Sequence, residues 1–416
     1  MSDLIRSWLP SANTSDTDFP VNNLPYGVFS VGDGDLRCGV ALGDRIVDAT
    51  GLEAAGHLRA DPAADVLDAP YWNDFMELGP EAWASYRAAL TAMLVDGADD
   101  AAQDTIMTFS VQRSEATLHL PFRVSEFTDF YAGRHHATNV GTMFRGAENA
   151  LPPNWLHMPI GYNGRASSVV VSGTDIQRSW GQVKGPGEDA PRWAPSARFD
   201  IELEIGALVG MPSTGPLSVD QAFANIFGYV LLNDWSARDI QAWEYQPLGP
   251  FQAKATATTI SPWIVTAEAL AAFRTPTPLR ERPLLPHLRD TGPMNHNIAL
   301  SVLLNGDTIA RTNANELYYS SAQQLAHHTS SGCPMRAGDL LGTGTISGPE
   351  THQRGSLLEL SWGGKEPIET SSGPRSFIED GDTLTLHGVA KGNGYSIGFG
   401  PCTGKVLPAA SDPFAT

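Results

Sequence analysis

The stretch RFDIELEIG, residues 198–206, alternates apolar and acidic side chains and is the strongest single constraint on the fold. A period of two predicts a β-strand whose apolar side chains share one face and whose carboxylates, Asp200, Glu202 and Glu204, share the other. Like charges placed side by side destabilise a sheet. The three carboxylates must therefore face water or surround a cation, and the nonapeptide alone favours water.

Strand-like segments dominate the second part of the chain. They are SSVVVSG (167–173), IFGYVLLNDWS (226–236), NIALSVLLNG (297–306), SLLELSWGG (356–364) and GDTLTLHGVA (381–390). Apolar spacing predicts helices at 81–95 and 316–328, and the Gly/Pro-rich segment 181–197 is expected to be a loop. With 41 glycines and 30 prolines as turn formers, the sequence predicts a mainly β fold of the α+β class.

Two domains are expected. Residues 23–50 contain short strand-like runs separated by Gly-Asp turns, which predicts a small β unit near the N-terminus. The texture changes near residues 115–122, after the helix predicted at 81–95. We therefore expect an N-terminal domain over 1–118 and a C-terminal domain over 119–416.

Charge and composition exclude several classes of partner. The formal net charge is -19, which argues against nucleic acids and anionic membrane surfaces as partners. Three widely spaced cysteines indicate no disulfide framework and fit a reducing compartment. The sequence shows no signal-peptide pattern and no run long enough to span a membrane, so a soluble cytoplasmic protein is expected.

Four carboxylates lie where plain solvation is least expected. Glu202 and Glu204, two apart on the predicted strand, are about 7 Å apart and side by side. Asp234 ends the apolar run FGYVLL, and Asp129 lies among aromatic residues in FTDFYAGRHH. Burying an unpaired carboxylate is costly, so these groups predict a cation bound by oxygen ligands, hence Ca²⁺, Mg²⁺ or Mn²⁺ rather than Zn²⁺. A set of unrelated strand-end acids is the alternative, and Asp200 is expected nearer solvent.

Polar and basic groups gather in the segment that follows Asp234. Arg238, Gln241 and Tyr245 have helical spacing and share one face, and Lys254 lies a little further along. Such a face could clamp an anion. The alternative is an ordinary solvated helix face, which the spacing alone favours.

The ordered sequence blocks of the chain resemble the fumarylacetoacetase family nearly from end to end. The blocks are NLPYGVFS (23–30), DFYAGRHHATNVGTMFRG (129–146), NWLHMPIGYNGRASSVVVSG (154–173), DIELEIG (200–206), IFGYVLLNDWSARDIQAWEYQPLGPF (226–251), TTISPW (258–263), GDLLGTGTISG (338–348), LLELSW (357–362) and GFGPCTGKVLP (398–408). The resemblance implies a small N-terminal SH3-like barrel, a C-terminal mixed β-roll and a homodimer.

The resemblance also implies a set of site residues. Asp129, Glu202, Glu204 and Asp234 match the family's Ca²⁺ ligands, and Asp234, Lys254 and Thr258 match its Mg²⁺ site. The substrate-contact positions match Tyr131, Arg145, Tyr162, Gln241, Tyr245 and Thr345. His136 matches the general base and Glu359 the carboxylate that orients it, while Arg238, Gln241 and Lys254 match the oxyanion donors. Two departures are visible, His135 beside His136 and Ala257 before Thr258.

The implied reaction is hydrolysis of a carbon–carbon bond in a dicarboxylic β-diketo acid, 4-fumarylacetoacetate, to fumarate and acetoacetate, the last step of tyrosine and phenylalanine catabolism. One alternative is a related acylpyruvate or fumarylpyruvate hydrolase, against which the long N-terminal part and WEYQPLGPF argue. A second is a non-catalytic Ca²⁺-binding protein of the same fold, against which the presence of His136 and Lys254 argues.

Overall fold

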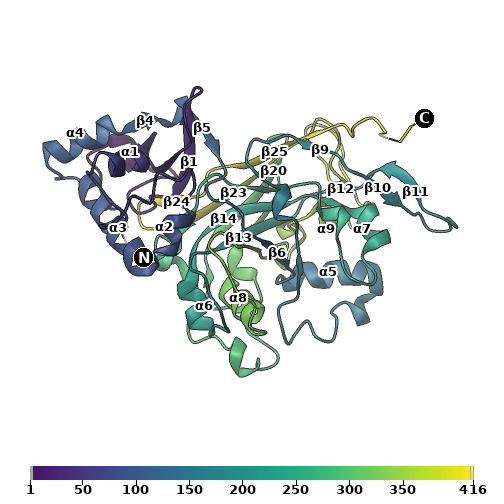
Figure 1. The fold of residues 1–416 in the computed structure, drawn as a ribbon. Coiled ribbons are helices and arrows are strands. Elements are labelled where there is room, and N and C mark those ends of the chain that lie inside the picture. The colour runs from purple at the N-terminus through teal and green to yellow at the C-terminus, as the bar shows by residue number, and fades with distance from the viewer. Residues whose placement is uncertain (1–2, 413, 416) are drawn as a thin grey trace.

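The computed structural model describes residues 3–412 and 414–415, and it is mainly β with helices at the edges (Figure 1). Three sheets carry most of the strands. The expected α+β class with a β majority is thereby confirmed. Within the described residues, no helix is long and apolar enough to cross a lipid bilayer.

A five-stranded antiparallel sheet forms the N-terminal unit, on the left of Figure 1. Its order is β4 (Ser110–Gln112), β3 (Arg45–Asp48), β2 (Arg37–Leu42), β1 (Tyr26–Val31) and β5 (Ala116–His119). The helices α1 (Ala49–Ala54), α2 (Asn73–Glu77), α3 (Pro80–Leu94) and α4 (Asp100–Thr108) accompany it. The helix predicted at 81–95 is confirmed as α3, and the SH3-like description of this unit stays a prediction.

The central sheet is the framework on which the polar residues are mounted. Its order is β7 (Gly161–Asn163), β6 (Phe127–Phe130), β22 (Leu340–Gly342), β13 (Leu203–Val209), β14 (Ile226–Asp234), β16 (Thr258–Ile260) and β8 (Val169–Val171), and β17 (Val265–Thr266) also pairs with β14. Every residue of β13 and β14 is buried, which is expected of strands covered on both faces. The acids on these strands are therefore removed from water.

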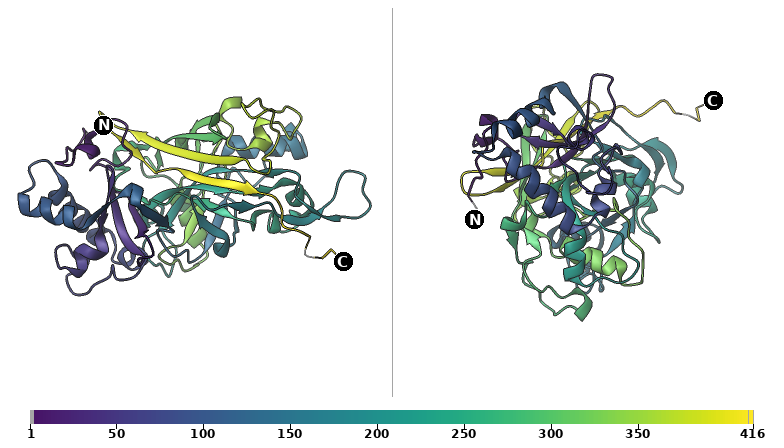
Figure 2. Two further views of the ribbon diagram at one scale, coloured as in Figure 1. Left: turned by 90° about the horizontal axis from the view of Figure 1, so that it is seen from above. Right: turned by 60° about the vertical axis from the view of Figure 1, so that its left-hand side comes forward.

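A second sheet covers the central one. Its order is β21 (Asp307–Asn313), β20 (Ala299–Leu304), β23 (Thr383–Lys391), β25 (Cys402–Leu407) and β9 (Ile176–Gln177), and β24 (Ser396–Gly398) pairs with β23. Along β23 every second residue is buried, so one face packs inward. The long C-terminal strands run across the molecule in the left view of Figure 2.

Shorter elements surround these sheets. The two-stranded pairs are β10 (Trp180–Val183) with β11 (Arg192–Pro195), β12 (Phe199–Asp200) with β15 (Ser236–Ala237), and β18 (Arg274–Thr275) with β19 (Asn295–His296). The remaining α-helices are α5 (Arg134–Arg145), α6 (Val219–Asn225), α7 (Arg238–Glu244), α8 (Ser321–Thr329) and α9 (Leu357–Leu360). Single 3-10 turns lie at Pro10–Asn13, Arg113–Glu115, Ala147–Asn149, Ala166–Ser168, Gln252–Lys254, Ala271–Phe273, Pro286–Leu288, Ala314–Glu316 and Thr351–Gln353.

Four local predictions need correction. The strand expected over 198–206 is interrupted after Asp200 and resumes at Leu203, because β12 pairs with β15 and β13 pairs with β14. SLLELSWGG is not a strand, because Ser356 accepts a hydrogen bond from the Glu359 N–H and caps the short helix α9. The segment 181–197 contains the hairpin β10–β11, and the helix expected at 316–328 begins only at Ser321, after a 3-10 turn.

The N-terminal unit shares its hydrophobic core with the central sheet. Tyr26 and Ile264 exchange two backbone hydrogen bonds of 3.0 and 2.8 Å. One continuous cluster joins Leu52 and Trp72 of the N-terminal unit to Phe227 and Val230 of β14. The two units therefore pack as parts of one hydrophobic core.

Candidate active site and metal centre

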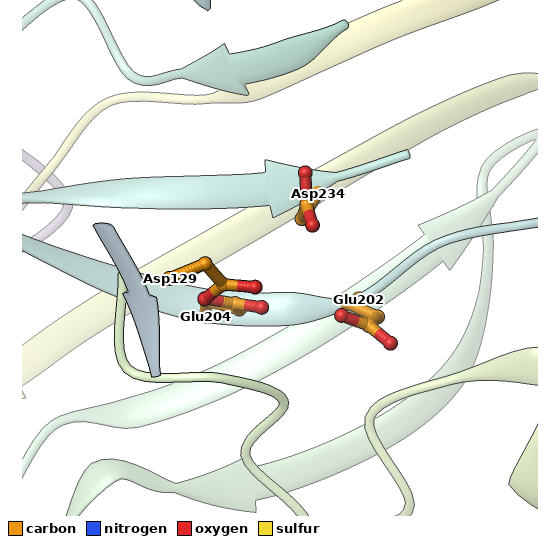
Figure 3. A group of neighbouring side chains, drawn as sticks. All are labelled: Asp129, Glu202, Glu204 and Asp234. Atoms are coloured by element: carbon orange, nitrogen blue, oxygen red, sulfur yellow. The ribbon is translucent and has the colours of Figure 1, made fainter. Parts of the chain in front are cut away.

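Four buried carboxylates converge where neighbouring strands of the central sheet begin or end (Figure 3). Asp129 lies on β6, Glu204 on β13 and Asp234 at the last position of β14, while Glu202 lies just before β13. One oxygen from each carboxylate lies within 4.8 Å of the others. Each of the four residues is at most 5% exposed. The strand order β6–β22–β13–β14 thus brings these four predicted ligands together.

Two fully buried carboxylate oxygens of the cluster lack a hydrogen-bond partner within the described residues. Among the described residues nothing donates to Asp129 Oδ1 or to Glu204 Oε1, while Glu204 Oε2 accepts from the Gly344 N–H at 2.9 Å. Burial raises the pKa of both side chains well above the usual carboxyl value, and the neighbouring carboxylates raise it further. Unsatisfied buried oxygens that are close together are what a bound cation would neutralise, and the cluster could hold a metal ion.

The other two carboxylates are already partnered by fixed groups. Glu202 Oε1 accepts from Arg238 Nη1 at 2.7 Å, and Glu202 Oε2 accepts from Lys254 Nζ at 2.5 Å. Burial alone would raise the pKa of Glu202, but the two cations outweigh it and hold that pKa well below its usual range. Lys254 Nζ also lies 3.1 Å from Asp234 Oδ2, so one ammonium bridges two of the acids.

Asp234 is held from two sides. Thr258 Oγ1 donates to Asp234 Oδ1 at 2.8 Å, and Tyr162 Oη donates to Asp234 Oδ2 at 3.1 Å. These contacts bring the predicted second metal group, Asp234, Lys254 and Thr258, to one place. An ammonium has three donors and no acceptor, so Lys254 could ligate a cation only through its backbone carbonyl.

A cavity of about 300 Å³ opens beside the cluster. It is lined by eleven of the sequence-predicted site residues, Asp129, Tyr131, His136, Arg145, Tyr162, Glu202, Arg238, Gln241, Tyr245, Lys254 and Thr345. Apolar side chains such as Phe130, Val140 and Ile160 complete the wall. A pocket with an apolar wall and a few convergent polar groups is typical of small-molecule sites.

A histidine–carboxylate pair borders the cavity. His136, on α5, lies with Nδ1 2.6 Å from Glu359 Oε2, and both side chains are buried. Burial alone would raise the pKa of Glu359, but His136 and the neighbouring donors hold it below its usual value. His136 Nε2 lies 4.0 Å from Glu202 Oε1, so the imidazole reaches from Glu359 toward the acid cluster. The fold joins two residues that are 223 positions apart.

Three further side chains fix Glu359, and sequence reasoning missed them. Asn139 Nδ2 donates to Glu359 Oε1 at 2.9 Å. Ser347 Oγ and Ser356 Oγ each donate to Glu359 Oε2 at 2.9 Å. Asn139 lies three positions after His136 on α5, so helical spacing from the histidine could have singled it out. Nothing in the sequence pointed to the two serines.

Arg238 bonds to several polar residues of the site, including Asp200, for which the sequence prediction was wrong. Asp200 is fully buried rather than near solvent, and its Oδ2 accepts from Arg238 Nε at 2.8 Å. The Arg238 guanidinium and the backbone N–H groups of Leu357 and Leu358 satisfy the buried carboxylate. Arg238 Nη1 donates to Glu202 and, at 3.1 Å, to Gln241 Oε1, while Nη2 has no hydrogen-bond partner in the described part of the chain.

The predicted substrate-contact residues lie around the cavity without forming one network. Tyr131 packs edge-on against His136, with ring centroids 5.4 Å apart. Arg145, in the last turn of α5, donates from Nη2 to the Ala150 carbonyl at 2.7 Å. Thr345 Oγ1 is buried and finds no partner among the described residues. These groups offer hydroxyl and guanidinium donors to a ligand in the cavity.

The glycine-rich segment GTGTISG, residues 342–348, leaves the end of β22 and passes close to β6. Gly344 has φ +74°, and a Cβ there would lie 2.2 Å from the Phe130 carbonyl oxygen. Only glycine therefore lets the 343–345 backbone approach β6 closely enough for the Gly344 N–H to reach Glu204.

The two departures from the family pattern, His135 and Ala257, lie outside the acid cluster. His135 faces Glu316, with its Nε2 3.5 Å from the Glu316 carboxylate, and Ala257 is buried.

Comparisons with known proteins cover almost the whole chain. Residues 126–407 match the model for the fumarylacetoacetate hydrolase C-terminal domain, and residues 22–121 match the model for the fumarylacetoacetase N-terminal domain. The fumarylacetoacetase of Homo sapiens is 47% identical over 419 residues, covering 97% of this chain and 99% of that protein. That of Caenorhabditis elegans is also 47% identical, covering 95% and 97%.

The solved structure of a fumarylacetoacetate hydrolase from psychrophilic Exiguobacterium antarcticum has a similar fold. Its TM-score is 0.55 at 16% sequence identity, and the match covers 92% of this chain and 99% of that one. At this identity the similarity concerns the fold.

Proposed function

The chain belongs to the fumarylacetoacetase family, and on that premise we propose how its buried site carries out the family's reaction. The protein is a hydrolase that cleaves a carbon–carbon bond of fumarylacetoacetate to give fumarate and acetoacetate. Identity of 47% that extends through the N-terminal unit favours this substrate over acylpyruvates. A non-catalytic calcium-binding role is not what these relatives indicate.

The observation that carries the proposed mechanism is the His136–Glu359 pair beside the acid cluster in one cavity. Glu359 accepts the Nδ1–H of His136, which fixes the tautomer and leaves Nε2 as a proton acceptor. His136 Nε2 then takes a proton from water as that water attacks the carbonyl next to the fumaryl group. Glu359 stabilises the imidazolium that forms, and its own three other donors keep it ionised.

A carbanion is a poor leaving group, so the site must stabilise the tetrahedral oxyanion and the departing enolate, whose carbon takes up the proton that His136 received from water and gives acetoacetate. We assign this task to Arg238, Gln241 and Lys254, which line the cavity. The contacts of Arg238 and Lys254 with Glu202 hold both cations in place before substrate arrives. Nη2 of Arg238 is buried and makes no hydrogen bond within the described residues. Losing one such donor typically costs roughly 3 kcal/mol of barrier.

Asp129, Glu202, Glu204 and Asp234 would hold Ca²⁺, and their two unpartnered oxygens support this assignment. Asp234, Thr258 and the carbonyl of Lys254 would hold Mg²⁺. When bound, a divalent cation here supplies a Lewis acid and a template for the diketone oxygens. The protein's own contribution is a dry, prearranged set of oxygen ligands whose repulsion the cation relieves.

The substrate carries a carboxylate at each end, and the cavity provides donors for both. We propose that Arg145, Tyr131 and Tyr245 bind one or both of these carboxylates, with Tyr162 and Thr345 completing the contacts. Burial raises the pKa of Tyr131 well above the usual phenol value, so its hydroxyl stays protonated and can donate. Arg145 lines the cavity, and its Nε and Nη2 donate to backbone carbonyls of the segment after α5.

Further parts of the proposal concern the whole molecule. We propose an N-terminal domain over 1–118, a catalytic domain over 119–416, a homodimer, and a cytoplasmic location in tyrosine and phenylalanine catabolism. Support for the boundary comes from the last strand of the N-terminal sheet, which ends at His119. Size measurement in solution tests the dimer.

The decisive experiment measures hydrolysis of fumarylacetoacetate by the purified protein, as prepared, after chelation, and after Ca²⁺ or Mg²⁺ is restored. We expect cleavage that disappears on chelation and returns with one of the two ions. The ion that restores the rate identifies the metal. Cleavage that survives complete chelation would contradict the metal role of the acid cluster and leave the histidine–carboxylate pair as the carrier of the reaction.

A further inference from the structure

We propose that Asp200 is a positioning residue that couples the oxyanion donor Arg238 to the carboxylate Glu359 across the site. Asp200 touches neither the cavity nor the acid cluster, and it ligates nothing in the scheme above. Its carboxylate nevertheless lies between the two groups on which the proposed mechanism depends most. The inference rests on the proposed roles of Arg238 and Glu359.

The first link runs from Asp200 to Arg238. Asp200 Oδ2 accepts from Arg238 Nε at 2.8 Å, and Glu202 Oε1 accepts from Nη1 at 2.7 Å. The carboxylates of Asp200 and Glu202 thus accept from two different nitrogens of the guanidinium and fix the orientation of its plane. Nη2, which has no hydrogen-bond partner in the described part of the chain, is left in a set direction. Because Glu202 is also assigned to the metal, Asp200 is the partner that holds Arg238 independently of the metal.

The second link runs from Asp200 to the short helix α9. Asp200 Oδ1 accepts from the Leu357 N–H at 2.8 Å, and Oδ2 accepts from the Leu358 N–H at 3.0 Å. These are the first two N–H groups of the helix that carries Glu359, and Ser356 satisfies the third. The position of Glu359, and through it the orientation of His136, is therefore tied to the carboxylate that orients Arg238.

The chemistry of these contacts requires a carboxylate rather than an amide. The side chain of Asp200 accepts from three backbone N–H groups, including its neighbour Ile201, and from one guanidinium, and it donates nothing. An asparagine would place an NH₂ group against at least one of these donors. We expect the amide to lose the Arg238 and Leu358 contacts, which share Oδ2, and to keep the Oδ1 contacts.

The test is Asp200→Asn in the full-length protein, assayed with fumarylacetoacetate under the metal conditions that give the wild-type rate. We expect kcat to fall by about ten-fold or more while KM changes by less than about three-fold, because the change acts on groups needed in the transition state. A merely structural role would lower the amount of folded enzyme and leave kcat per folded molecule unchanged.

Asp382→Asn is the matched control. Asp382 is also buried, accepts from the Arg375 guanidinium at 3.1 and 3.2 Å and from the Glu379 N–H at 2.9 Å, and lies outside the cavity lining. Its exchange should lower the midpoint of unfolding without changing kcat of the folded fraction. Equal kcat losses in the two variants would overturn the proposal.

A double-mutant cycle separates this inference from the proposed function. Arg238→Met alone should lower kcat strongly, and Asp200→Asn should cost much less in that background than in the wild type. Full activity of Arg238→Met would refute the donor role itself. Loss of activity in Arg238→Met together with wild-type kcat in Asp200→Asn would refute only the positioning role. If neither Asp200→Asn nor Asp200→Glu folds, Asp200 serves the fold and the proposal is overturned.

Discussion

Exchanging Glu204 for glutamine should stabilise the metal-free protein and at the same time weaken its response to calcium. Glu204 Oε1 and Asp129 Oδ1 are buried without partners among the described residues, in a cluster whose ligand atoms lie within 4.8 Å of one another. A buried unsatisfied group costs roughly 1–3 kcal/mol, and more when it is charged. A glutamine amide is always neutral, so it avoids the cost of burying or protonating a carboxylate here, and it can donate to Asp129. We expect the free energy of unfolding without metal to rise by about 1–3 kcal/mol.

The response to calcium should change in the opposite direction. At a calcium concentration 100 times the wild-type Kd, binding adds about 2.7 kcal/mol to the free energy of unfolding. A ten-fold weaker site at the same concentration adds only about 1.4 kcal/mol. Glu204→Gln should therefore lose about half of the calcium stabilisation, or more if the affinity falls further.

The assay is denaturant unfolding of both proteins in chelator and in calcium, with calorimetric titration of the ion. Glu53→Gln is the matched control, because Glu53 is also buried but accepts three backbone N–H groups in the N-terminal unit, at 2.6 to 3.1 Å. That control should be destabilised and bind calcium normally. A Glu204→Gln protein that is less stable than wild type in chelator, or equally stabilised by calcium, would refute the reasoning.

Two other predictions concern histidines. His136→Ala should keep the circular dichroism spectrum of the wild type but lose turnover. His135→Ala should keep its turnover, because the His135 side chain faces Glu316 instead of Glu359. Equal rates for the wild type and the two variants would remove His136 as the base. Burial and the nearby Arg274 lower the pKa of His296 from 6.5 to about 4, so folded His296 stays neutral while the unfolded chain takes up a proton below pH 6.5. Stability should therefore fall as the pH drops from about 6.5 toward 4, by up to about 3 kcal/mol from this group. His296→Gln should flatten that slope in denaturant midpoints measured across the range, and an unchanged slope would show that other groups cause it.

The acid cluster was accessible to sequence reasoning because its members mark strands. Glu202 and Glu204 share one side of a period-two pattern, and Asp234 follows an apolar run that forms a buried strand. Which strands lie side by side is a long-range property. Only the order β6–β22–β13–β14 explains why Asp129, some seventy positions away in sequence, joins them.

The failures have a local cause. The alternation of 198–206 predicts two faces, but the strand pairing is interrupted after Asp200. The Asp200 carboxylate is buried against Arg238 and the start of α9 instead of facing solvent. In SLLELSW the apolar residues mask a four-residue helix whose start is set by Ser356. Short elements stabilised by one side-chain cap carry too little periodicity to be distinguished from a strand.

The pairing of His136 with Glu359 came from the family resemblance, because no local pattern connects residues 223 positions apart. The donors Asn139, Ser347 and Ser356 around Glu359 were found only in the structure. Their task is to satisfy a buried carboxylate, and the need for such donors is evident only once the burial of Glu359 is known.

The hydrophobic core shared by the N-terminal unit and the central sheet affects how sequence variation reaches the active site. Phe227 and Val230 belong to the same strand that ends in Asp234, and they pack in one cluster with Leu52 and Trp72. A cavity opened at Trp72 would loosen the strand that positions a metal-site carboxylate, although no atom near the substrate has changed. Inherited or engineered changes in the first 118 residues can thus abolish activity by lowering the folded fraction, and ligands that stabilise the folded protein would be expected to restore it.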